Sequence, residues 1–431
     1  MNPLLFFIVI LIYIVCINIL NEKLFHMQSD IALIFFTLIS SAVLLILKQF
    51  VDFDFLTGYI ENVSRLEFSE YLMDGVLCFM LFAGASKVNM SKFKTNLRPI
   101  FLLAFLSTFI SSFFFGGIFY LIALLFRLPM DFWTCVLLGC IVSPTDPIAA
   151  TGILNKIGLS KNVCSVIENE SLFNDGTGVT LFIFVRSMIT SSEGGGENFA
   201  VLMLREVLGA CIVAFVISFI FFSLLKITHN PINYIIISLL DVSLVYMICE
   251  HFGFSGVIAS VVCGLFFSYE MNKIKRVAVV VDREHFYEHF WEILESLLNA
   301  ILFVMIGLSV LGADICNAFA VIIPATLFAL ITSRFIGVSM STLLTGRRIP
   351  GGYNLTEFSC LMTWSALKGG LSLALAMQTV SLFDDELFKI ILTATYTAIF
   401  FSVLVQGLTV KNVYFALEDH KTKRIHGAGK A

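Results

Sequence analysis

Two carboxylates lie in the middle of an otherwise apolar segment, Glu170 and Asp175, within the run ESLFNDG. A charged side chain at bilayer depth costs a few kcal/mol on insertion scales, so such a residue usually has a function. A third acid, Asp146, stands between Pro144 and Pro147 in the preceding apolar segment. Three such acids within about 30 residues predict a path for a cation or a proton.

The composition requires a lipid environment. Of the 431 residues, 58% are hydrophobic and 13% are charged, whereas a soluble domain has about 25% charged residues. The ten cysteines and seven histidines show no metal-ligand spacing, so we expect no metal centre and no cofactor. We also expect no enzymatic activity and no nucleic-acid partner.

Apolar runs of about 20 residues predict about thirteen membrane-spanning helices. We therefore expect an all-α membrane protein with a single transmembrane domain over 1–410 and a short cytoplasmic tail over 411–431. The first apolar run lacks a basic start and a cleavage site, so we interpret it as a retained span. The predicted spans are 3–20, 31–48, 70–87, 99–126, 132–154, 163–188, 200–225, 232–249, 254–269, 293–312, 316–345, 357–380 and 387–409.

The basic residues predict the orientation. Nineteen of the 27 Lys and Arg fall in the odd-numbered loops and the C-terminal tail, and six fall in the even-numbered loops. Because cytoplasmic loops are enriched in Lys and Arg, we expect a cytoplasmic C-terminus and an N-terminus outside.

Two predicted spans are interrupted. The fifth contains Pro144 and Pro147, and the twelfth contains Lys368, Gly369 and Gly370 in the middle of its apolar run. Inverted-repeat transporters place broken helices at matching positions of their two halves. An offset of seven spans gives these two helices opposite orientations. We therefore expect two inverted repeats with crossed helices, and a core near 132–188 and 357–409.

The break at the two prolines creates polar groups that need partners. Proline removes backbone donors, and carbonyls freed in this way cannot remain bare in hydrocarbon. They can line a wet cavity and coordinate a cation, with help from Thr145 and Asp146. The alternative is a simple proline kink in which Asp146 caps a half-helix. The two interpretations are compatible.

On the sixth span, helical spacing groups the polar residues into two faces. Glu170 and Asn174 are four residues apart and share one face, and Ser171 and Asp175 share the next. Oxygen ligands of this kind suit a small, hard cation such as Na⁺. The candidate pocket consists of Thr145, Asp146, Ser171 and Asp175.

Two basic residues lie deep within spans. A buried acid is tolerated when a base pairs with it, and Arg334 is the obvious partner for Glu170. Lys368 either neutralises half-helix dipoles at the crossing or responds to the substrate. Asp74 and Asp241 are lone acids, to which we assign packing or access roles.

Histidines are absent from this group of residues, so a proton carrier in the core must be a carboxylate. The pair His285 and His289 lies four residues apart in a basic loop, where it acts as a pH sensor or is simply solvated.

Five motifs together resemble one family. SPTDPIA, ESLFNDG, SRFIGV, ALKGGLSLALA and FFSVLVQGLTV occur in that order, and they are similar to motifs of the monovalent cation–proton antiporters of the NhaP and sodium–proton exchanger type. The similarity extends over nearly the whole chain and includes the thirteen spans of that family.

The resemblance implies roles for single residues. Asp175 would bind the ion and the proton, and Asn174 would mark the electroneutral branch. Glu170 would pair with Arg334. Lys368 stands where many relatives have Arg, so a bidentate fork is lost there. Homodimers and an elevator-like movement of the core would also follow. The remaining cation-site residues would be Thr145, Asp146 and Ser171.

The expected function is exchange of Na⁺ or Li⁺ for H⁺ across the cell membrane, one for one, by alternating access at Asp175. Such exchange serves pH homeostasis. K⁺/H⁺ exchange on the same scaffold is an alternative, because both cations are bound by oxygen. A channel or sensor is disfavoured, since a pore usually shows a filter repeated by symmetry.

Overall fold

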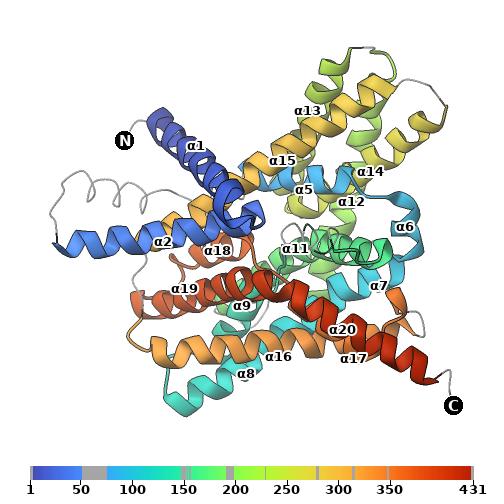
Figure 1. Ribbon diagram of the computed structural model, residues 1–431. Helices are drawn as coiled ribbons and strands as arrows, with labels where there is room; N and C mark the ends of the chain where they lie inside the picture. The colour runs from blue at the N-terminus through green and yellow to red at the C-terminus, as the bar shows by residue number, and fades with distance from the viewer. Residues whose placement is uncertain are drawn as a thin grey trace.

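The structure is a computed structural model of the full chain. It describes residues 3–50, 75–146, 152, 154, 157–190, 199–228, 230–277, 281–312, 316–346 and 349–428. Two residues singled out from the sequence, Asp74 and Pro147, lie outside this part of the chain. Within it, every regular element is a helix (Figure 1), which confirms the all-α prediction.

The helices follow the predicted spans in order. Seven helical stretches of the described residues are long and apolar enough to cross a membrane, and each predicted span contains described helix. The N-terminal half contains α1 (Pro3–Leu20), α2 (Ser29–Phe50), α5 (Leu77–Ser86), α6 (Met90–Thr95), α7 (Leu97–Phe101), α8 (Thr108–Phe126), α9 (Phe132–Val142) and α11 (Lys161–Thr190). The remainder contains α12 (Phe199–Leu225), α13 (Pro231–His251), α14 (Gly256–Val277), α15 (Val281–Ser309), α16 (Phe319–Thr345), α17 (Leu355–Trp364), α18 (Gly370–Met377), α19 (Asp385–Phe400) and α20 (Gly407–Ala428).

The buried side chains form two clusters. The larger one joins α9, α11, α16, α18 and α19. The smaller one joins α5 with α12, α13, α14 and α15, which lie together at the upper right of Figure 1. At its centre Phe82 packs against Trp291, with ring centroids 4.5 Å apart, and against Phe267 at 5.4 Å. The interrupted helices therefore belong to one cluster and a separate helical layer lies beside it.

Small residues bring α8 and α9 into close contact. A Cβ on Gly116 would lie 2.6 Å from Val136, and a Cβ on Gly139 would lie 2.2 Å from the carbonyl oxygen of Ser112. Each helix thus inserts backbone where the other has a glycine. Close backbone approach through small residues is the usual way to pack helices in a membrane, and it anchors α9 beneath its break.

Both interrupted spans have local reasons to start and stop where they do. The Asp131 side chain caps α9 by accepting from the backbone N–H of Thr134 at 3.1 Å, and α9 ends at Val142, two residues before Pro144. Proline there cannot continue the helical hydrogen bonding. In the twelfth span α17 ends at Trp364 and α18 begins at Gly370, so the break spans the predicted Lys-Gly-Gly position.

The glycine contact between α8 and α9 leads to a prediction. We expect Gly116→Leu to destabilise the protein by about 1–3 kcal/mol, because the added side chain overlaps Val136 in a packed interface. Thermal unfolding of the purified protein in detergent measures this. Gly117→Leu is the matched control, since a Cβ on Gly117 meets nothing within 4 Å. Equal losses in the two variants would contradict the packing argument.

Candidate cation site

The two helix breaks contact each other directly. The backbone N–H of Asp146 donates to the carbonyl oxygen of Leu367 at 2.8 Å, which forms an isolated β-bridge. The Lys368 ammonium donates to the carbonyl oxygens of Ser143 and Pro144 at 3.1 and 3.2 Å. A cation at the C-terminal end of a helix is favoured by the helix dipole. Lys368 therefore binds the carbonyls that the proline break leaves free.

The last of the five sequence motifs, FFSVLVQGLTV, contacts the break of the twelfth span. The backbone N–H of Lys368 donates to the hydroxyl of Ser402 at 2.9 Å, on a π-helical turn, Phe401–Gln406. The amide of Gln406 reaches the carbonyl oxygen of Thr363 at 3.4 Å. Ser402 and Gln406 belong to the motif FFSVLVQGLTV but were not among the predicted site residues. Their polarity within an apolar run was the available signal.

Two glycines allow the crossing to be this close. A Cβ on Gly369 would lie 3.0 Å from Oδ2 of Asp146, and a Cβ on Gly370 would lie 2.3 Å from Leu302. A larger residue at position 370 would therefore force the Leu302 side chain of α15 to move. The Gly-Gly pair is thus needed for close approach of helices at the site.

A buried hydrogen-bond network lies behind the crossing. The side-chain amide of Asn174 accepts from the backbone N–H of Thr145 at 3.2 Å and donates to the Thr145 hydroxyl at 2.6 Å. The same amide donates to Oε1 of Glu170 at 3.0 Å. The hydroxyls of Thr145 and Ser171 are 2.7 Å apart. The structure therefore brings these four predicted residues together and uses Asn174 to hold α9 against α11.

Glu170 and Arg334 form a buried ion pair. Nη2 of Arg334 lies 2.9 Å from Oε1 of Glu170, and the two side chains are 5% and 1% exposed. This is the pairing that the sequence suggested. The charge of Glu170 is compensated within the protein, and the pair ties α11 to α16.

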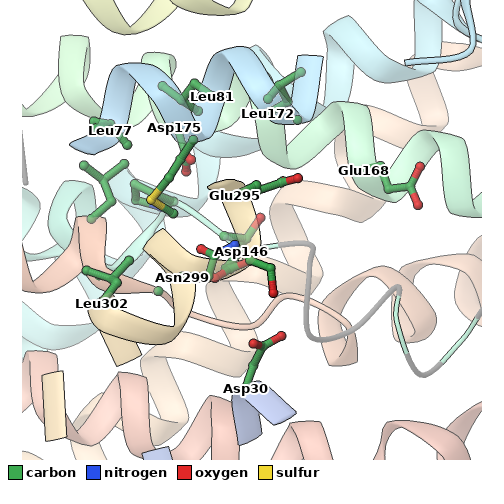
Figure 2. A pocket seen from close by; sticks show the side chains of 18 of the residues that line it. Asp30, Leu77, Leu81, Asp146, Glu168, Leu172, Asp175, Glu295, Asn299 and Leu302 are labelled. Carbon is green, nitrogen blue, oxygen red and sulfur yellow. The ribbon is translucent and has the colours of Figure 1, made fainter. Parts of the chain in front are cut away.

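A cavity of about 520 Å³ reaches this site (Figure 2). Asp175 and Asp146 both line it, with Thr145, Pro144 and the two glycines of the twelfth span. Ser171 and Asn174 are not among the lining residues, so they belong to the network behind it. The other polar residues that line the cavity are Asp30, Lys87, Glu168, Glu292, Glu295, Ser296, Asn299 and Ser372.

Asp175 differs from the acids around it. Its carboxylate makes no hydrogen bond and no ion pair with any residue in the described part of the chain, and it is partly exposed to the cavity. Glu295 pairs with Lys87, and Asp30 accepts from Gln28 at 3.4 Å. A carboxylate that faces a wet cavity without a partner is available to bind a cation or a proton.

Part of this cavity is lined by residues that were not among the predicted site residues. Asp30 stands one residue before the second predicted span, and Glu295 and Asn299 lie inside the tenth. The signal was available, since a charged residue within a span is a functional candidate. Glu168, near the start of the sixth predicted span, is also exposed at the cavity.

Two further residues singled out from the sequence lie elsewhere. Asp241 is buried in the smaller cluster, where it accepts from the Cys263 thiol at 2.9 Å, and it does not line the cavity. His289 lies 3.7 Å from Glu292. Groups of His, Cys, Asp and Glu that would hold a metal ion are absent from the described residues.

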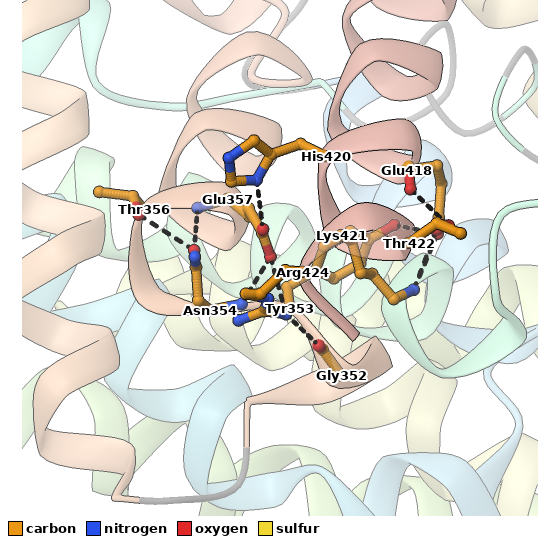
Figure 3. A network of polar contacts seen from close by, with 10 residues as sticks. All are labelled: Gly352, Tyr353, Asn354, Thr356, Glu357, Glu418, His420, Lys421, Thr422 and Arg424. Atoms are coloured by element: carbon orange, nitrogen blue, oxygen red, sulfur yellow. Dashed lines mark hydrogen bonds and ion pairs between the residues drawn. The ribbon is translucent and has the colours of Figure 1, made fainter. Parts of the chain in front are cut away.

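The N-terminus of α17 is fixed by the last part of α20 (Figure 3). Glu357 is buried and accepts from the backbone N–H of Asn354 at 2.8 Å. It also contacts Nδ1 of His420 at 2.8 Å and Nη2 of Arg424 at 3.1 Å. Residues 411–428, predicted as a tail, thus continue α20 and hold one half of the interrupted span in place.

The fold and the site define a class, a multi-pass helical membrane protein in which two broken helices meet beside an acidic cavity. Residues 31–416 match the family model of the sodium/hydrogen exchanger, transmembrane. The chain belongs to this family, as its five motifs predicted.

Comparisons with individual proteins agree with this family assignment. The chain is 32% identical to the Na(+)/H(+) antiporter NhaP of Pseudomonas aeruginosa over 384 residues, 85% of this chain and 86% of that one. It is 30% identical to the Na(+)/H(+) antiporter NhaH of Halobacillus aidingensis, over 72% of this chain and 74% of that one. The structure of the sodium proton antiporter MjNhaP1 from Methanocaldococcus jannaschii superposes with a TM-score of 0.73 at 17% identity, covering 97% of this chain and 99% of that one. The fold is therefore shared.

The buried ion pair leads to a second prediction. We expect Glu170→Gln to lower the free energy of unfolding by about 3–5 kcal/mol, because it leaves the Arg334 guanidinium buried without a counter-charge. Thermal unfolding in detergent measures the loss. The double variant Glu170→Gln, Arg334→Met removes both charges, so it should be more stable than Glu170→Gln alone. A double variant that loses as much as the two single variants combined would contradict the pairing.

Proposed function

We propose that this protein is a secondary transporter that exchanges Na⁺ or Li⁺ for H⁺, one for one, at Asp175. Membership of the sodium/hydrogen exchanger family supports this proposal, as do relatives named Na(+)/H(+) antiporters at 32% and 30% identity. The cation and the proton are the substrates, and the lipid bilayer is the solvent of most of the surface.

A difference between two acids carries the proposal. Glu170 is neutralised by Arg334 at 2.9 Å, whereas Asp175 faces the cavity without a hydrogen bond or ion pair to any described residue. A single carboxylate of this kind can hold either a proton or a cation. Loading one ion requires release of the other, which is the elementary step of exchange.

The neighbouring residues set the charge carried in each step. Asn174 is a neutral amide engaged with Thr145 and Glu170, so it adds no second titrating group to the site. With Asp175 as the carboxylate that exchanges ions and Asp146 as a ligand of constant charge, one positive charge moves in each direction. We therefore propose electroneutral exchange, with Asp146, Thr145 and Ser171 contributing oxygen atoms around the cation.

The cavity also suggests which side is open. Its rim contains Lys87, Glu168 and Glu292, which lie beside loops that the Lys and Arg distribution assigns to the cytoplasm. We propose that this structure is open to the cytoplasm, with the N-terminus outside and the C-terminus inside. Alternating access, an elevator-like movement and a homodimer in the plasma membrane complete the proposal.

Removal of the Asp175 carboxylate tests the assignment. In liposomes with an imposed pH gradient, Asp175→Asn should reduce Na⁺-driven proton movement to the level of empty vesicles, because an amide cannot exchange a proton. Glu168→Gln is the matched control, because it makes the same acid-to-amide change about two helical turns earlier on α11 at an exposed position, and it should keep most of the activity. Normal exchange by Asp175→Asn would refute the proposal. Parallel assays with Na⁺, Li⁺ and K⁺ identify the cation.

A voltage experiment tests the one-for-one exchange. When the Na⁺ and H⁺ gradients are balanced so that net exchange stops, an imposed potential of either sign should leave the exchange stopped, because no net charge moves. A potential of 100 mV acts on each net charge with about 2.3 kcal/mol, so an electrogenic exchanger would restart readily. A voltage-dependent shift of the balance point would rule out electroneutral exchange.

A further inference from the structure

The helix α15 presents a polar face to the cavity. Its lining residues Glu292, Glu295, Ser296, Asn299 and Leu302 follow helical spacing along one face. The exposure falls along this face, since Glu292 and Ser296 are exposed and Asn299 is only 1% exposed. Asn299 is therefore the deepest polar residue that α15 contributes.

The side chain of Asn299 has an unusual environment. Its Oδ1 is buried and has no hydrogen-bond partner in the described part of the molecule. A buried polar atom without a partner costs about 1–3 kcal/mol, and most such atoms in proteins are satisfied. By contrast, the amide of Asn174, in the network behind the cavity, has both ends engaged by hydrogen bonds. An orphaned oxygen at the wall of an acidic cavity therefore points to a ligand.

Close contacts place Asn299 beside the crossing of the broken helices. Leu302 lies one turn further along α15, in contact with the position of Gly370, and Oδ2 of Asp146 lies against Gly369. These two glycines are consecutive, so both side chains meet the same short break. Figure 2 shows Asn299 and Asp146 in the same part of the cavity, with Glu295 and Asp30 near them in that view.

We propose that Oδ1 of Asn299 is a ligand of the transported cation, on the side of the site opposite α11. This inference rests on the proposed function and extends it to a residue of α15. Amide oxygens are ordinary ligands of hard cations. Because an amide carries no charge, this ligand adds affinity and leaves the one-for-one balance set by Asp175 unchanged. It also gives α15 a direct contact with the substrate.

The test compares the cation dependence of variants at this position. In liposomes, Asn299→Ala should raise the Na⁺ concentration for half-maximal exchange about tenfold, which corresponds to about 1.4 kcal/mol of binding free energy. The maximal rate should change much less, because Asp175 still carries the proton. Asn299→Asp keeps an oxygen at the same place and should restore the Na⁺ affinity at least to that of the native protein.

Ser296→Ala is the matched control, since it removes an exposed oxygen one turn earlier on the same face and should leave the Na⁺ dependence unchanged.

Stabilisation of the purified protein by Na⁺ in thermal unfolding provides a second measurement, which also reports on folding. Asn299→Ala should need about tenfold more Na⁺ to reach the same stabilisation, and Ser296→Ala should need no more than the native protein. An unchanged Na⁺ dependence in Asn299→Ala would refute the ligand role while Asp175→Asn still abolished exchange. Absence of exchange in the native protein would instead refute the proposed function. In that case the stabilisation by Na⁺, compared between the native protein and Asn299→Ala, would still show whether Asn299 binds the cation.

Discussion

The site depends on the ammonium of Lys368 binding the carbonyls that end α9. Two half-helices that meet in a membrane leave backbone groups without partners, and such groups are costly in hydrocarbon. Lys368 donates to Ser143 and Pro144 at 3.1 and 3.2 Å, and the bridge between Asp146 and Leu367 satisfies one more pair. The polar crossing is stable because these groups satisfy one another, and the oxygen atoms of the candidate site gather around it.

Compensation of charge distinguishes the acids near the crossing. Glu170 is paired with Arg334 and held by Asn174, so it stabilises the contact of α11 with α16 and α9. Asp175 lies one turn further along the same helix, and it faces the cavity. The same chemical group is thus a paired structural residue at one position and, at the other, a carboxylate that faces the cavity without a partner among the described residues. The difference comes from what lies opposite each residue.

The cavity is made by elements from both hydrophobic clusters. The helices α5 and α15 contribute to both clusters. Their cavity-lining residues Leu77, Leu81 and Leu302 belong to the larger cluster, whereas Phe82 and Trp291 belong to the smaller one. Asn299 lies on the part of α15 that packs in the larger cluster, next to Ala300 and Leu302. Because the other end of α15 packs in the smaller cluster, an α15 ligand would link the bound cation to a helix that contacts both clusters.

The sequence by itself determined the membrane environment, the order of the helices, the position of both breaks and the family. Each is encoded locally, by apolar run length, by proline and glycine, or by the spacing of a few motif residues. It also identified Glu170 and Arg334 as partners, because a lone buried arginine needs an acid. Only the tertiary structure placed Asp30 and Asn299 at the cavity and Ser402 behind Lys368. These contacts join residues far apart in the chain, and helix packing alone decides which of their many polar neighbours they meet.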